Sequence, residues 1–129
     1  MSKSLALFIA FSGLVHAAHA EETGLSKQFS TCIDKSGGVT STMLDCIGSE
    51  TKVQDARLNK AYKYVIATLS PSRKTELQEA QRAWIKFRDA NCRFYLDPDG
   101  GTMASVNSAD CLMSTTANRA KELEAFRAQ

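Results

Sequence analysis

Apolar and polar positions recur with a helical period along the segment 77–92. At about 100° per residue, one stripe of such a helix carries Leu77, Gln81, Trp84, Arg88 and Cys92. An apolar stripe normally faces a core, so Gln81 and Arg88 are polar side chains directed into a region with little water. Buried polar groups need hydrogen-bonding partners, and a cysteine at the end of the stripe needs a second cysteine. The segment therefore predicts a packed helical domain with an internal polar network and a disulfide.

Two further stretches show the same period, and turn residues separate the helices. Ser70 and Pro71 supply an N-cap and a proline at the first helical position, so one helix ends and the next begins there. The helix before this turn is expected to start near Thr42, and the last helix near Ser108, with 102–107 as a loop. The stripe of the earlier helix consists of Leu44, Ile47, Thr51, Leu58, Tyr62, Val65 and Leu69. The stripe of the last helix consists of Leu112, Thr116, Arg119, Leu123 and Phe126. The pattern predicts an all-α fold, with a small antiparallel helical hairpin and a third packed helix.

A tight turn between the first two long helices sets the register of the hairpin and predicts an ion pair across it. In that register Asp55 lies within a helical turn of Arg88 and borders the apolar stripe of its own helix. We therefore expect an Asp55–Arg88 pair, with Asn59 and Gln81 as neighbouring amide partners. Arg119 lies inside the third stripe and is expected to join this network or to compete for Asp55. Removing one partner of a desolvated ion pair costs about 3–5 kcal/mol.

The first twenty residues have the features of a secretory signal peptide. Lys3 gives a positive start, 5–15 is an apolar run, and Ala18-His19-Ala20 matches an A-x-A cleavage site. The apolar run is too short to span a bilayer as a helix, and no cysteine directly follows the cleavage point for lipid attachment. We expect a periplasmic or secreted protein, cleaved near Ala20, with a single domain over 21–129 and no stable membrane anchor.

All four cysteines lie in the expected mature chain, and in an exported protein an even number indicates disulfides rather than metal ligands. No C-x-x-C pair occurs, so neither a thioredoxin-like redox site nor a zinc ribbon is supported. Four cysteines allow three pairings, which the sequence alone does not separate. We favour Cys32–Cys46 and Cys92–Cys111, because each pair brackets a glycine-containing loop between expected helices.

Composition excludes several functional classes. Both histidines, His16 and His19, lie in the expected signal peptide, so the mature chain has no imidazole for Ser-His-Asp or Cys-His catalysis or for zinc. The 16 Lys and Arg include Lys3, so 15 remain against 14 Asp and Glu, which gives no electrostatic reason for nucleic-acid binding. We expect no enzymatic activity, no cofactor and no metal.

The chain contains, in this order, the motifs Cys46, Asp55-x-x-Leu58-Asn59-x-x-Tyr62, Leu77-x-x-Ala80-Gln81-x-x-Trp84, Arg88-Asp89-x-x-Cys92, Gly100-Gly101, Cys111 and Arg119. This ordered set resembles the LprI lysozyme-inhibitor family over roughly 32–126. The resemblance implies a small helical domain in the bacterial envelope and, for at least some members, inhibition of host-type lysozyme by protein–protein contact. Its namesake type is lipid-anchored, whereas this chain lacks the acylated cysteine.

The inward positions of these motifs leave the segment 97–110 as the candidate partner-binding loop. It contains Asp97, Asp99, Gly100, Gly101 and Asp110 and no basic residue. Common host lysozymes are basic, so an acidic loop would associate with them faster. Two alternatives stay open. The loop is an ordinary solvated connector, or the protein is a periplasmic interaction or stress-response module with another envelope partner.

Overall fold

The computed structural model describes residues 24–127. The predicted signal peptide, residues 1–20, and its cleavage site lie outside this part of the chain. None of the helices described is long and apolar enough to cross a membrane. The predicted all-α fold is confirmed, since 24–127 contain helices and no strand: α1 (Lys27–Ser36), α2 (Thr40–Thr68), α3 (Pro71–Phe94) and α4 (Gly101–Arg127).

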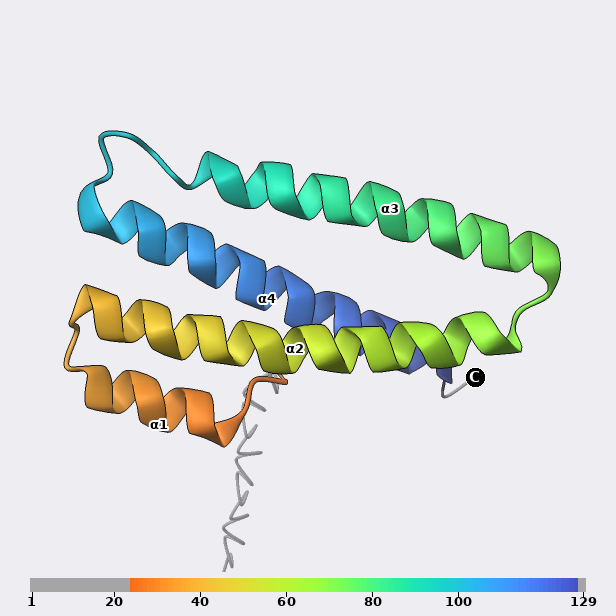
Figure 1. Cartoon of the computed structure of the whole chain (residues 1–129), viewed down its shortest axis with the longest axis horizontal. Coiled ribbons are helices and arrows are strands. Elements are labelled where there is room, and N and C mark those ends of the chain that lie inside the picture. Colours follow the sequence, from red (N-terminus) through yellow and green to blue (C-terminus); the bar gives the residue numbers. More distant parts are fainter. Residues whose placement is uncertain (1–23, 128–129) are drawn as a thin grey trace, which may run out of the picture.

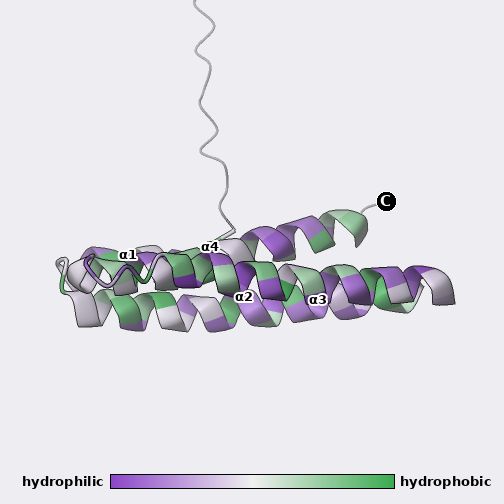
Figure 2. Cartoon of the chain, turned by 90° about the horizontal axis from the view of Figure 1, so that it is seen from above, coloured by the Kyte–Doolittle hydropathy of each residue, from purple (hydrophilic) through white to green (hydrophobic). Residues whose placement is uncertain are grey.

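The helices lie side by side in the spatial order α1, α2, α4, α3 (Figure 1). α2 and α4 run in the same direction and share the most extensive contact, while α1 packs on α2 and α3 packs on α4. α2 and α3 form the predicted hairpin through the turn at Ser70, and α4 is the additional packed helix that separates the two arms. The molecule is therefore elongated and shallow, and only the last turns of α4 rise out of the layer (Figure 2).

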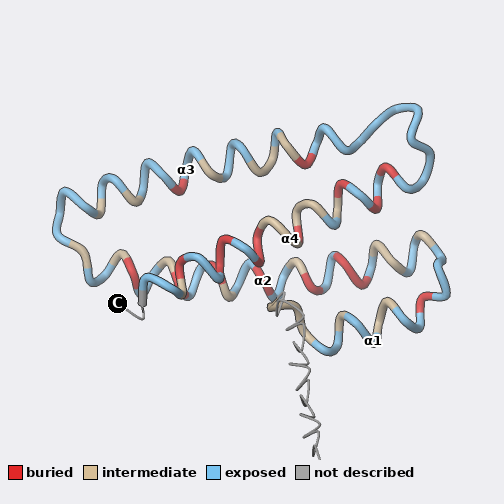
Figure 3. Tube along the Cα trace, turned by 180° about the vertical axis from the view of Figure 1, so that it is seen from behind, coloured by how far each residue is buried: buried red, intermediate tan, exposed pale blue. Residues whose placement is uncertain are grey.

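The core consists of two apolar clusters along the contact between α2 and α4. Figure 3 shows the buried positions following these two helices, while α3 is exposed over most of its surface. Between the clusters, α2 places the polar side chains of Glu50 and Gln54, which are 3% and 1% exposed. One cluster contains Leu58, Ala61, Ala120 and Leu123, packed against Tyr62, Leu77 and Trp84. The other contains Ile47, Val106 and Met113, packed against Leu25, Phe29, Ile33, Met43, Leu44 and Ala109.

Local signals explain the first and third helices. Ser26 caps α1, because its side-chain oxygen accepts a hydrogen bond from the Phe29 backbone N–H at 3.1 Å. Gly37 ends α1 with φ of 58°, a left-handed conformation that suits glycine at a helix C-terminus. α3 begins at Pro71, as the Ser70-Pro71 pair predicted.

The starts of the other two helices differ from the predictions. α2 begins at Thr40 rather than Thr42. α4 begins at Gly101 rather than Ser108, so the segment 102–107, predicted to be a loop, is helical. Ala104, Val106 and Ser108 are at most 8% exposed. Burial of this first part of α4 stabilises the helix where local composition gives no helical signal.

Both favoured disulfides are present. Cys32–Cys46 joins α1 to α2 with a Cα–Cα distance of 5.7 Å, and Cys92–Cys111 joins α3 to α4 at 5.4 Å. The connection between α1 and α2 and the one between α3 and α4 lie at the same end of the layer (Figure 1). Covalent links therefore hold this end, while the opposite end, at the turn between α2 and α3, depends on noncovalent packing.

Candidate protein-binding site

The connection between α3 and α4 is fixed at its base by a disulfide and two polar contacts. Cys92 and Cys111 are bonded, and the Ser108 hydroxyl donates to the Cys92 carbonyl oxygen at 2.9 Å. The Asn91 side-chain amide contacts the Cys111 sulfur at 3.6 Å. The last turn of α3 is thereby held against the first part of α4. The connecting residues 95–100 form a tight bend, which we call the corner.

The corner itself is organised by the Asp97 side chain and backbone. Asp97 Oδ1 accepts a hydrogen bond from the Asp99 backbone N–H at 2.9 Å, and the Asp97 carbonyl accepts one from the Gly100 N–H at 3.0 Å. A Cβ at Gly100 would lie 2.9 Å from Ala104 Cβ, so only glycine lets the chain pass so close to α4. Gly101 starts α4 with φ of 61°. These contacts give the corner a defined shape.

Apolar side chains that no core cluster covers surround this corner. Tyr95, Leu96 and Met103 are 47%, 51% and 48% exposed. Together with Asp97 and Asp99 they form what we call the corner surface. An open hollow of about 690 Å³ lies beside it, between the end of α3 and the start of α4. Exposed aromatic and aliphatic groups beside a hollow are typical of protein contact sites.

The charge of the corner surface is negative. The segment 94–110 contains three aspartates and no lysine or arginine, and Arg93 is the basic residue that lines the hollow. Helical spacing places Asp110 on the same side of α4 as Met103. Burial raises the pKa of the Asp110 carboxyl above its ordinary value. The corner therefore presents apolar groups among acidic ones.

The structure shortens the predicted partner-binding loop. Asp97, Asp99 and Gly100 lie in the connection, whereas Gly101 and Asp110 belong to α4. The prediction of a loop over 97–110 is therefore wrong beyond Gly100. In the described part of the chain, no group of three or more His, Cys, Asp or Glu side chains is placed to hold a metal ion.

The apolar part of the corner surface was missed in the sequence. Its signal is the run Phe94-Tyr95-Leu96 directly before the turn residues. Consecutive positions of a helix point in directions about 100° apart, so three neighbouring apolar residues cannot all face one core.

Part of the predicted internal polar network is present at the contact between α3 and α4. Arg119, 9% exposed, donates from Nε to Gln81 Oε1 at 3.0 Å. The guanidinium carbons of Arg88 and Arg119 lie 5.1 Å and 5.9 Å from the centroid of the Trp84 ring, within the range of cation–π attraction. Glu122 pairs with Arg119 at 2.7 Å. The contacts of Arg119 with Gln81 and Trp84 hold α3 to α4, whereas its pair with the exposed Glu122 lies within α4.

The predicted Asp55–Arg88 ion pair is wrong. Arg88 pairs with its neighbour Asp89, with Nη2 2.8 Å from Oδ1. Asp55 is exposed and accepts a hydrogen bond from the Asn59 side chain at 3.2 Å. The register of the hairpin does not bring them together, because α4 lies between its arms and the inward face of α3 meets α4 instead.

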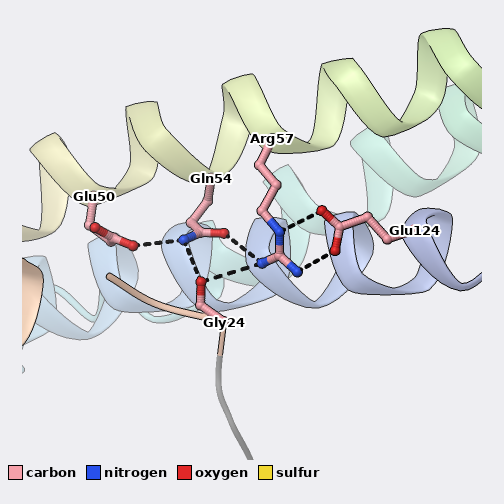
Figure 4. Close-up of polar contacts among 5 residues, drawn as sticks. All are labelled: Gly24, Glu50, Gln54, Arg57 and Glu124. Atoms are coloured by element: carbon pink, nitrogen blue, oxygen red, sulfur yellow. Dashed lines mark hydrogen bonds and ion pairs between the residues drawn. The ribbon is translucent and has the colours of Figure 1, made fainter. Parts of the chain in front are cut away.

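A second polar network, on α2, was not predicted (Figure 4). Gln54 donates from Nε2 to the Gly24 carbonyl at 2.9 Å and to Glu50 Oε1 at 2.7 Å, and its Oε1 accepts from Arg57 Nη1 at 3.0 Å. Arg57 also makes two hydrogen bonds to the Glu124 carboxylate, at 2.7 Å and 2.6 Å. The network ties the segment before α1 to α2 and α4. Its sequence signal was the polar face formed by positions 50, 54 and 57, which share one side of a helix.

The pKa values in this network follow from its contacts. Burial alone would raise the pKa of Glu50, but hydrogen bonds from the Ser26 hydroxyl, from Gln54 and from the Ser26 backbone N–H together lower it. The hydrogen bonds to Glu124 raise the pKa of Arg57 against the effect of burial. Both groups are therefore charged at neutral pH and act as structural ties rather than as an acid–base pair.

Comparisons with known proteins show which family the chain is similar to. The family model described as "Lysozyme inhibitor LprI" matches residues 32–123, a segment that contains the four cysteines and the corner. An uncharacterized protein of Rhizobium meliloti (strain 1021) is 31% identical over 93 residues, which cover 61% of this chain and 67% of that protein. No solved structure matches the chain.

Proposed function

Because the chain belongs to the lysozyme inhibitor LprI family, we propose that it is a non-enzymatic protein of the bacterial envelope that binds and inhibits lysozyme. In this proposal a signal peptide is cleaved near Ala20, and a single domain over 21–129 acts in the periplasm or outside the cell. We assign the contact with lysozyme to the corner surface. The observation that carries this assignment is the combination of exposed apolar groups with acidic ones on a rigid connection.

The composition of the corner surface suits a basic protein partner. Binding energy at interfaces comes mostly from a few buried aromatic or aliphatic anchors, and Tyr95 and Leu96 are available for this role. Charges at the rim contribute mainly to the association rate, and Asp97 and Asp99 would be attracted to a positively charged lysozyme surface. The acidic groups thus steer the encounter and the apolar groups hold the complex.

The rigidity of the corner supports the same role. The Cys92–Cys111 disulfide and the hydrogen bonds to Asp97 order this connection before any partner arrives. A surface that is already ordered loses less conformational entropy on binding than a mobile loop does. The Arg119–Gln81 contact and the Trp84 ring, by contrast, stabilise the fold beneath it.

The direct test measures lysis of bacterial cell walls by a basic c-type lysozyme, followed by turbidity, with purified mature protein added. We expect inhibition that saturates as the protein reaches molar excess. A complete lack of inhibition at micromolar excess would remove the proposed function. Binding to an immobilised lysozyme, measured in parallel, separates weak affinity from a lack of inhibition.

Variants of the corner surface test where the contact lies. Replacing Tyr95 and Leu96 with alanine should weaken binding at least about tenfold, because both anchors are lost. Asp97→Asn with Asp99→Asn should lower the association rate and make it less sensitive to salt, with a small effect on dissociation. The matched control is Asp55→Asn with Glu76→Gln, which removes the same charge from exposed positions on α2 and α3.

Equal effects of the acidic variant and its control would place the contact elsewhere on the molecule. If corner variants instead abolish capture of a resident envelope protein, and lysozyme shows no affinity, the module serves another envelope partner.

A further inference from the structure

An exposed side of α3 carries an apolar stripe with coiled-coil spacing. Its five members follow one another at intervals of three and four residues, as the a and d positions of a heptad do. All five are exposed, and the two large ones, Phe87 and Phe94, are 62% and 82% exposed. We call Ala80, Ala83, Phe87, Ala90 and Phe94 the outer α3 stripe.

The two ends of the outer α3 stripe complement each other in shape. Phe94, at one end, is the most exposed of the large apolar side chains described. At the other end, Ala80 borders an apolar hollow of about 260 Å³, where the start of α3 meets the ends of α2 and α4. Leu77, Leu69 and Phe126 also line this hollow. A projecting ring and a hollow that can accept a ring thus lie two heptads apart on one helix face.

We infer that α3 pairs in antiparallel orientation with α3 of a second copy of this chain. With a two-fold axis at Phe87, that residue faces its own copy and Ala80 faces the partner's Phe94. Ala83 then faces the partner's Ala90, so a large side chain meets a small one at each end and small residues meet in between. Each Phe94 ring enters the hollow beside Ala80 in the other copy. Such self-complementarity is what a two-fold interface requires.

The charges beside the stripe favour the antiparallel orientation. Glu79 and Arg93 are exposed and precede Ala80 and Phe94 by one residue, which places both on the same flank of the stripe. Antiparallel pairing brings Glu79 next to the partner's Arg93 at each end of the interface, and opposite charges meet twice. Lys86 lies on the same flank near the axis, where it meets its own copy and limits the affinity.

The size of the contact predicts a weak dimer. From Ala80 to Phe94 the helix is about 21 Å long at about 1.5 Å per residue, so two such helices bury an area at the low end for specific interfaces. We therefore expect a dissociation constant on the order of 10–100 μM, with both species present at ordinary laboratory concentrations. α3 is an outermost helix of the layer (Figure 1), and the exposed residues of the outer α3 stripe are free to meet a second copy.

Sedimentation equilibrium of the purified mature chain between about 5 and 500 μM tests the inference, since this range brackets the expected dissociation constant. We expect reversible association to twice the monomer mass. Phe87→Ala should weaken it at least about tenfold, because the axis makes each substitution remove two rings from the interface. Val53→Ala, which shortens an exposed apolar side chain on α2, is the control and should leave the dimer unchanged. Circular dichroism verifies that each variant keeps its helices.

A charge exchange tests the register. Glu79→Arg alone and Arg93→Glu alone should each weaken the dimer several-fold, and the double variant should restore it, because the opposite charges then meet again in exchanged positions. A parallel pair would show no such restoration.

A chain that stays monomeric at every concentration, or a dimer that Phe87→Ala leaves intact, would overturn the inference. So would a monomer whose binding to anionic lipid vesicles depends on Phe87. The proposed contact with lysozyme is tested separately, since Phe87 and Glu79 lie outside the corner surface.

Discussion

Replacing Gln54 with leucine tests whether the polar network between the two apolar clusters stabilises the fold. Gln54 is 1% exposed, and its side chain bonds to the Gly24 carbonyl, the Glu50 carboxylate and the Arg57 guanidinium. Leucine has a similar volume, so the change removes three hydrogen bonds without opening a cavity. All the groups left behind keep another partner in the network, which limits the damage.

The expected loss follows from the kinds of bond involved. A neutral hydrogen bond contributes about 0.5–1.5 kcal/mol and one to a charged group about 1.5–3 kcal/mol, and two of the three bonds of Gln54 involve charged groups. The gross loss is therefore about 3.5–7.5 kcal/mol. Burying a leucine in place of an amide returns about 2 kcal/mol. We expect a net destabilisation of about 1.5–5.5 kcal/mol, a large share of the about 5–15 kcal/mol that stabilises a typical domain.

Urea unfolding of the disulfide-bonded protein, followed by far-UV circular dichroism, measures this loss. The midpoint should fall while the dependence of the unfolding free energy on urea stays the same. The control is Gln78→Leu, the same change at an exposed position of α3, which should alter stability by no more than about 0.5 kcal/mol. If both variants lose equally little, the network does not stabilise the fold and the reasoning is refuted.

Three further outcomes are expected. The pKa of Glu50 is lowered in the folded protein, so the contribution of this carboxylate to stability is present above about pH 4.5, the ordinary pKa of the group. The contribution is lost as the pH falls through the folded-state pKa. Glu50→Gln should therefore flatten the acid side of a pH–stability profile measured by thermal unfolding. Replacing Cys92 and Cys111 with serine should cost about 3 kcal/mol in urea unfolding, and a variant as stable as the parent would contradict the loop-closure account. Asp55→Ala should change stability by less than about 0.5 kcal/mol, whereas a loss of several kcal/mol would indicate the ion pair with Arg88 that the fold lacks.

The start of α3 and both disulfides were readable in the sequence because each has a local signal. The Ser70-Pro71 pair marks the start of α3, and each cysteine pair brackets a glycine-containing connection. The start of α4 was not readable in this way. Residues 102–107 contain no helical stripe of their own, and they are helical because Ala104 and Val106 pack into the layer.

The partners of buried polar groups depended on the order of helices in space, which no local signal specifies. A direct contact between α2 and α3 would have placed Asp55 near Arg88. Because α4 lies between these helices, Arg119 of α4 forms a hydrogen bond with Gln81 of α3 instead. The corner surface was half predicted. Its acidic residues were visible as a run without basic ones, while the exposure of Tyr95 and Leu96 depends on how α3 packs on α4.

Because both disulfides lie toward one end of the layer, the two ends of the molecule should differ in local stability. Fraying by heat or mild denaturant should begin at the turn between α2 and α3, where amide protons should exchange with solvent sooner than those near Cys46 and Cys92. The corner surface lies at the cross-linked end and should keep its shape during such local unfolding. The proposed contact with lysozyme should therefore be lost on exposure to thiol reductants rather than on mild warming.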